Sequence, residues 1–152
     1  MKLGILSDTH GRLRDEVLRL LAGSDLILHA GDVGATEVLE RLRALAPVLA
    51  VRGNTDTDPP LTSLPFSVVD DLAGQRVCMV HRREDVLPAW PREAALVIFG
   101  HSHRPELEWH GKALFLNPGA CGAPRFRLPL SLARVELTAD GRLEPEILRV
   151  PR

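Results

Sequence analysis

Short apolar runs alternate with stretches of helical periodicity through the first third of the chain. The runs at 2–6, 26–28 and 48–51 consist largely of Leu, Ile, Val and Ala, which is typical of strands buried on both faces. Between them, residues 15–21 and 36–45 place apolar side chains three and four positions apart, as on one face of a helix. This order predicts a βαβαβ unit with parallel strands and right-handed crossovers.

The alternation of strand and helix stops after the third strand. Prolines within 58–65 exclude a helix there. The β-rich runs 66–69 and 76–80 flank the turn residues 72–74, which predicts a hairpin. A short helix, interrupted by two prolines, is expected over 85–94.

The rest of the chain consists of predicted strands and turns. The segments predicted as strands are 96–99, 106–110, 113–116, 130–137 and 143–150. The whole pattern predicts an α/β fold in which two sheets pack together and are flanked by helices, within a single domain over residues 1–152.

The overall composition argues against some classes of function. A hydrophobic content of 45% and a charged content of 26% are those of an ordinary globular protein. The net charge of −1 provides no basic field for sequence-independent binding, so nucleic acid is not expected as a partner. The chain has only two cysteines, and it shows no signal-peptide layout and no apolar run of membrane-spanning length. These features predict a cytoplasmic protein without a membrane partner.

Polar side chains that can hold metals follow the ends of five predicted strands. In chain order they are Asp8 and His10, then Asp32, Asn54, His81, and finally His101 and His103. Because strands of a mostly parallel sheet end at one edge, these side chains are expected to converge on one site.

The chemistry of this set narrows the choice of metal. Two carboxylates, one amide and four imidazoles suit Mn, Fe, Zn, Co or Ni better than Ca or Mg. The lack of cysteine in the set argues against a structural zinc site. The pairs Asp8/His10 and His101/His103 each point the same way from an extended backbone, so they can reach one metal or two adjacent metals. Asp32 can bridge two metals through its two oxygens.

The ordered motifs resemble those of the calcineurin-like metallophosphoesterase superfamily. The pattern DxH, GD, GN, H and GHxH is met at 8–10, 31–32, 53–54, 81 and 100–103. The NPG turn at 117–119 resembles the turn found in the small single-domain phosphodiesterase branch of this superfamily, to which the retromer scaffold subunit is related. The resemblance covers residues 3 to about 122 and implies a metallophosphatase-like, four-layer α/β/β/α sandwich of two mixed sheets.

The resemblance also implies a function and an assignment of ligands. It predicts a phosphodiesterase that uses two divalent metals to hydrolyse a small phosphoester. Mn²⁺ is the preferred candidate for these metals, and Zn²⁺, Fe, Ni²⁺ or Co²⁺ are alternatives. The first metal would be held by Asp8, His10, Asp32 and His103. The second would be held by Asp32, Asn54, His81 and His101. A bridging hydroxide would attack phosphorus in line with the leaving oxygen, without a protein nucleophile.

Two departures from the family pattern affect the expected substrate. Thr55 stands where many members have a histidine, and a threonine hydroxyl cannot supply a proton at neutral pH, so poor leaving groups should react slowly. Arg82 and Arg83 replace a Gly-His pair after His81, and either arginine could grip a phosphate oxygen.

Four further residues have two interpretations each. His29 is either a residue that orients a ligand or an ordinary buried histidine. Asp56 is either an acceptor for a ligand histidine or a turn residue. Arg125 and Arg127 either bind phosphate or lie on the surface.

Two other classes of function are compatible with parts of the pattern. A catalytically weak or inactive protein-binding scaffold is the alternative suggested by the retromer subunit, but the presence of His10 argues against it. A nuclease is disfavoured by the charge. Small members of the family self-associate, so the resemblance predicts a homo-oligomer, either a dimer or a tetramer.

Overall fold

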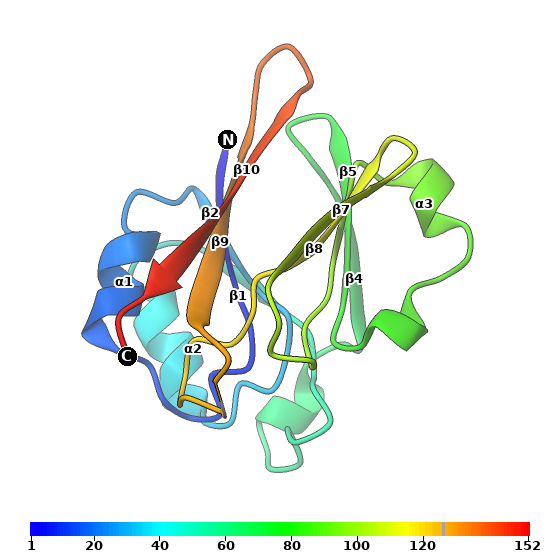
Figure 1. Ribbon diagram of the computed structural model, residues 1–152. Coiled ribbons are helices and arrows are strands. Elements are labelled where there is room, and N and C mark those ends of the chain that lie inside the picture. The colour runs from blue at the N-terminus through cyan, green and yellow to red at the C-terminus, as the bar shows by residue number, and fades with distance from the viewer. Residues whose placement is uncertain (126) are drawn as a thin grey trace.

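Two mixed sheets form the framework of the computed structural model, which describes residues 1–125 and 127–152 (Figure 1). The first sheet has the order β10–β9–β1–β2–β3. Its strands are β1 (Lys2–Leu6), β2 (Leu26–His29), β3 (Val48–Ala50), β9 (Leu130–Leu137) and β10 (Leu143–Val150). The three N-terminal strands pair in parallel, and β9 and β10 extend the sheet in antiparallel register beside β1.

The second sheet also has three parallel strands, but its antiparallel strands lie one at each edge. Its order is β4–β5–β6–β8–β7, in which β5, β6 and β8 are parallel. Its strands are β4 (Ser67–Leu72), β5 (Gln75–Val80), β6 (Leu96–Ile98), β7 (Glu106–His110) and β8 (Ala113–Asn117). The edge strands β4 and β7 pair antiparallel with their neighbours.

Helices cover the outer faces of the two sheets. The helices α1 (Asp15–Leu21) and α2 (Thr36–Arg43) pack on the first sheet, and the short α3 (Trp90–Glu93) packs on the second (Figure 1). The expected four-layer α/β/β/α sandwich is therefore confirmed. None of the helices in the described part of the chain is long and apolar enough to cross a membrane.

The alternation of side chains along β1 shows how the sequence builds these layers. Ile5 belongs to the apolar cluster between the sheets, whereas the next residue, Leu6, belongs to the cluster under α1 and α2. Both side chains are fully buried, which contributes about 2 kcal/mol each. A strand buried on both faces needs such a continuous apolar run, since successive side chains point in opposite directions.

The helix expected over 85–94 is wrong in its extent. Only Trp90–Glu93 is α-helical, and a 3₁₀ turn spans Arg83–Asp85. Pro91 lies in the first turn of α3, where its missing N–H removes no hydrogen bond. Pro88 disfavours helical backbone at the residue before it, so the helix cannot extend back to 85.

Candidate metal centre

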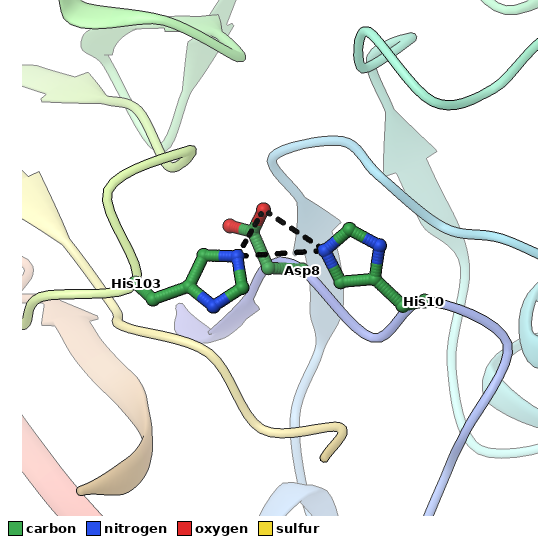
Figure 2. A group of neighbouring side chains, drawn as sticks. All are labelled: Asp8, His10 and His103. Atoms are coloured by element: carbon green, nitrogen blue, oxygen red, sulfur yellow. Dashed lines mark hydrogen bonds and ion pairs between the residues drawn. The ribbon is translucent and has the colours of Figure 1, made fainter. Parts of the chain in front are cut away.

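The carboxyl ends of strands from both sheets carry the candidate ligands. Asp8 and His10 follow β1, Asp32 follows β2, His81 follows β5, and His101 and His103 follow β6. Within the described residues they form two groups, each with its donor atoms within 4.8 Å of one another: Asp8, His10 and His103, and Asp32, His81 and His101. Figure 2 shows the rings of His10 and His103 turned toward each other beside the Asp8 carboxylate.

The two groups adjoin at Asp32. Its Oδ2 atom lies 3.2 Å from Nε2 of His81 and 3.7 Å from Nε2 of His10, so one oxygen faces both groups. In the first group, Oδ1 of Asp8 lies 3.4 Å from Nε2 of His103. Ligands of one ion, each about 2.1 Å from it, lie about 3 Å apart, so these separations are close to those of a metal site.

Each carboxylate has one oxygen tied to the protein and one directed to the centre. Oδ2 of Asp8 accepts hydrogen bonds from Oγ of Ser7 at 2.6 Å and from the backbone N–H of His101 at 3.0 Å. Oδ1 of Asp32 accepts the backbone N–H of Thr55 at 2.9 Å. The remaining oxygens, Oδ1 of Asp8 and Oδ2 of Asp32, are thereby oriented toward the histidines.

Unsatisfied buried atoms test whether a cation fits here. Oδ1 of Asp8 and Nε2 of His81 are buried without a hydrogen-bond partner in the described residues, although buried polar atoms normally have one. Nδ1 of His81 must donate to the carbonyl oxygen of Ala30, 2.7 Å away, because that oxygen can only accept. In the neutral ring the lone pair of His81 is therefore on Nε2, the atom that faces Asp32. These donors fit a divalent transition metal.

The electrostatics of the centre favour ionised carboxylates. Burial alone would raise the pKa of Asp8, but His10, His103 and Ser7 outweigh it and hold that pKa well below its usual range. For Asp32, burial is likewise outweighed, by His81 and the backbone N–H of Thr55, which lowers the pKa to about 2. Two buried negative charges therefore face one another across the histidines, and a cation would neutralise them.

The backbone is left-handed at almost every candidate ligand. The φ angle lies between 47° and 72° at Asp8, His10, Asp32, His101 and His103. In the described residues, Ala73 is the only other non-glycine residue with positive φ. This conformation costs about 1 kcal/mol per residue and persists only where surrounding contacts impose it, typically at functional sites.

Two motif glycines are required by close approach to these loops. A Cβ atom at Gly53 would lie 2.0 Å from Oδ1 of Asp32, and one at Gly100 would lie 2.1 Å from Oγ of Ser7. Neither distance is compatible with a side chain, so the glycines of the GN and GHxH motifs allow the loops to pack.

His29 and Asp56 hold loop backbone. Nδ1 of His29 accepts the N–H of Gly31 at 3.1 Å, and its Nε2 lies 3.0 Å from Oγ1 of Thr9. Burial lowers the pKa of His29 to about 4, which keeps the ring neutral. Asp56 accepts the backbone N–H groups of Val33, Gly34 and Gly53, so of its two interpretations the structure supports a role in the turn.

The sequence interpretation missed the support given by Asn117. This side chain is fully buried, and its Nδ2 donates to the carbonyl oxygen of Gly100 and to Oγ of Ser102. Its Oδ1 accepts the N–H of Gly119. The NPG motif was visible in the sequence, but nothing there indicated that its asparagine fastens the loop of His101 and His103.

The remaining candidates differ in their contacts and exposure. Asn54 and Thr55 are exposed in the loop after β3, where the backbone N–H of Thr55 contacts Asp32. The guanidinium of Arg83 pairs with Glu106 at 3.2 Å and lies over the rings of Phe99 and Phe115, which argues against a contact with phosphate. Arg82 is half-buried next to His81, and Arg125 and Arg127 are exposed.

Comparison with known proteins agrees with this geometry. A family model described as the calcineurin-like phosphoesterase superfamily domain matches residues 1–140. A probable metallophosphoesterase of Methanothermobacter thermautotrophicus is 31% identical over 98% of this chain and 92% of its own length. Phosphodiesterase YfcE of Escherichia coli is 32% identical over 90% of this chain and 88% of its own length.

Solved structures give the same result for the fold. The structure of YfcE superposes with a TM-score of 0.72 at 29% identity, over 90% of this chain and 88% of that one. Vps29 of Entamoeba histolytica, solved in complex with zinc, has a TM-score of 0.75 at 22% identity over 98% and 99% of the two chains, which shows likeness of fold alone. From its motifs, its fold and these relatives, the chain belongs to the calcineurin-like phosphoesterase superfamily.

Proposed function

We propose that this protein is a divalent-metal-dependent phosphodiesterase. The observation that carries the proposal is the meeting of two three-residue donor groups at a single oxygen, Oδ2 of Asp32. A pair of adjacent cations held there would share Asp32, which the N–H of Thr55 orients through Oδ1. The names of the archaeal and bacterial relatives support the same class of activity.

Each group would hold one metal. Asp8, His10 and His103 would bind the first, and His81 and His101, with the amide of Asn54, would bind the second. Mn²⁺ is our first candidate, with Zn²⁺, Fe, Ni²⁺ or Co²⁺ as alternatives, since carboxylate and imidazole suit all of them. When bound, a metal pair supplies an activated water as nucleophile and neutralises charge on the phosphoryl oxygens.

We propose that the side chains of the protein orient the substrate and neutralise the charge of its phosphate, and that none of them attacks phosphorus. Burial raises the pKa of Cys78 to about 11 and that of Cys121 to about 12, so neither thiol provides a nucleophile near neutral pH. Arg82, beside His81, is the remaining arginine that we assign to phosphate. Thr55 offers a hydroxyl but no acid, so we propose that diesters and monoesters with good leaving groups are the preferred substrates.

An assay of metal-loaded protein tests the proposal. The chain would be stripped of metal and reloaded separately with Mn²⁺, Zn²⁺, Co²⁺ and Ni²⁺. Turnover would then be measured on bis(p-nitrophenyl) phosphate and on p-nitrophenyl phosphate. We expect faster turnover of the diester with at least one metal, and none in Asp32→Asn. Absence of turnover on both esters with every metal would contradict the proposal.

A protein-binding scaffold is the competing interpretation. The structural likeness to Vps29 leaves this alternative open, because that likeness concerns the fold. Buried, unpartnered donor atoms such as Oδ1 of Asp8 favour a bound metal, but Vps29 was itself solved with zinc, so turnover and not metal binding separates the two interpretations. A protein that binds metal fully and turns over neither ester would favour the scaffold.

A further inference from the structure

A hollow of about 360 Å³ borders the candidate metal centre on the side of His81. The residues that line it include Arg52, Phe66, Val80, His81, Leu87 and Trp90. Arg52 comes two residues before Asn54, and Val80 comes directly before His81. The hollow therefore lies between the two chain segments that lead into candidate ligands of the second metal.

The wall of this hollow is mixed: Ser67 and Asp85 line it together with Arg52 and His81, and its apolar part contains two accessible side chains. Phe66 is 70% exposed and Leu87 is 55% exposed, whereas Val80 and Trp90 are almost fully buried. An isolated exposed apolar side chain is ordinary, but two that line one concave surface next to a site are typical of a ligand pocket.

Arg52 holds the exposed ring of Phe66 in place. The guanidinium carbon lies 5.3 Å from the centre of the ring, within the range of a cation–π contact. The Nε atom of Arg52 donates at 2.9 Å to the carbonyl oxygen of Asp56, which fixes the guanidinium to the loop after β3. The ring is thus positioned before any ligand arrives, which reduces the entropy lost on binding.

We propose that the hollow binds one ester group of the substrate and that this group is aromatic, either an aryl ring or a nucleobase. The inference rests on the proposed phosphodiesterase function, because the metals would fix the phosphate next to His81. A planar ring can stack on Phe66 and on the guanidinium of Arg52, and the volume accommodates one. A methyl ester would leave the apolar walls in water.

Direct binding of phosphonates tests this subsite without requiring turnover. Trp90 lines the hollow and Trp109 is the other tryptophan of the chain, so in Trp109→Phe the fluorescence reports on Trp90 alone. Phenylphosphonate and methylphosphonate would be titrated into the Zn²⁺-loaded protein. We expect the phenyl compound to bind about tenfold more tightly and to change the Trp90 emission. Thymidine 5′-monophosphate, as a third ligand, distinguishes a nucleobase from a simple aryl ring.

Variants of the walls provide the control. Phe66→Ala and Leu87→Ala should each reduce the preference for phenyl over methyl by about three- to tenfold, with methylphosphonate affinity unchanged. Leu107→Ala makes the same exchange at a leucine that is 42% exposed on β7 and outside the hollow, and it should change neither affinity.

The outcomes separate this inference from the proposed function. Equal affinity for the two phosphonates would overturn the subsite even if diesters are hydrolysed, and so would an equal loss of affinity for both phosphonates in Phe66→Ala. The hollow would then be a surface for another occupant such as a protein. A Phe66-dependent preference in a protein without turnover would retain the subsite as an aromatic phosphate-ester binding site and contradict the hydrolase.

Discussion

Asn117 donates a hydrogen bond of 3.0 Å to Oγ of Ser102, the residue between His101 and His103. A second donor hydrogen of the same amide reaches the carbonyl oxygen of Gly100 at 3.1 Å. The loop after β6 has left-handed backbone at both histidines, so it depends on such contacts to keep its shape. A residue at the end of β8 thereby positions candidate ligands of both metals.

Replacing this amide should weaken metal binding without removing a ligand. In Asn117→Ala the buried carbonyl of Gly100 loses a partner, so we expect about 1–3 kcal/mol lower stability and roughly 10- to 100-fold weaker metal affinity. Chelator competition and thermal unfolding of the metal-free protein measure the two effects. Ser102→Ala removes one of the contacts and should have a smaller effect. Unchanged affinity in Asn117→Ala would show that the loop keeps its geometry without the amide.

Loss of Asp32 should affect both metals, unlike loss of a residue in one group. Because Oδ2 of Asp32 faces His81 and His10, Asp32→Asn should lower the metal content from about two per chain to below one. His81→Ala should remove mainly one metal. Elemental analysis of the purified variants gives the content, and His110→Ala, an imidazole on β7, is the control that should retain both. Two full equivalents in Asp32→Asn would contradict the bridge.

The histidines make metal affinity depend on pH in a defined direction. Contact with Asp8 is the largest influence on His10 and raises its pKa; for His81, burial lowers the pKa but Asp32 and Asp8 raise it more. Protons therefore compete with metal to a higher pH than at an ordinary histidine. Affinity should fall about tenfold per pH unit for each group as the pH drops through these raised pKa values. Chelator-competition titrations between pH 6 and pH 8.5 measure this slope.

The same shifts give the metal-free protein the opposite dependence. A histidine whose pKa is raised in the folded state stabilises the fold when it is protonated. This stabilisation is fully present below the ordinary histidine pKa of about 6.5 and is lost as the pH rises through the pKa of the folded state. The metal-free protein should therefore become less stable from pH 6.5 upward, while the metal-loaded protein becomes more stable. Thermal unfolding with and without chelator shows this divergence, and parallel curves would contradict it.

The positions of the candidate ligands could be predicted from the sequence because they depend on local patterns. A buried strand ends where its apolar run ends, so Asp8, Asp32 and His81 could be placed at strand ends from their neighbours alone. The side of the sheet follows from the parallel order of the strands. The backbone at these residues could not be predicted, since left-handed φ is expected of glycine and here occurs at Asp8 and Asp32.

Residues whose roles depend on distant partners were misjudged or missed. Arg83 follows a ligand candidate in the sequence, yet its charge is paired with Glu106 on another strand. The sequence left two interpretations of Asp56 open, and neither indicated that it accepts N–H groups from the loop after β2. Such pairings join segments 20 or more residues apart, and no periodicity or motif spacing encodes them.

Introducing a histidine at position 55 should broaden the substrate range. The side chain of Thr55 is exposed, and the contact with Asp32 uses the backbone N–H, so Thr55→His preserves that contact. An imidazole next to the centre can protonate a leaving oxygen at neutral pH, and we expect monoesterase turnover to rise about tenfold or more. Thr55→Asn, which can donate a hydrogen bond but not a proton, should show no rise. Lower activity of Thr55→His on every ester would contradict the role of the missing acid.

The hairpin between β4 and β5 offers a stability test far from the centre. Its two turn residues, Ala73 and Gly74, have φ of 47° and 79°, the pattern of a type I′ turn, in which Asn-Gly is preferred. Ala73→Asn should raise the free energy of unfolding by about 0.5–1 kcal/mol, because asparagine tolerates left-handed backbone better than alanine. For a chain of this size, the melting temperature should rise by about 1–4 °C.

Gly74→Ala is the matched control in the same turn. A Cβ atom at Gly74 would meet no heavy atom within 4 Å, so any loss of stability in Gly74→Ala reports backbone strain alone. The turn lies at the start of β5, whereas His81 follows its end, so neither exchange should change metal content. Thermal unfolding of the metal-free variants measures both effects. If Ala73→Asn fails to stabilise while Gly74→Ala destabilises, the left-handed backbone at Ala73 carries no strain that asparagine relieves.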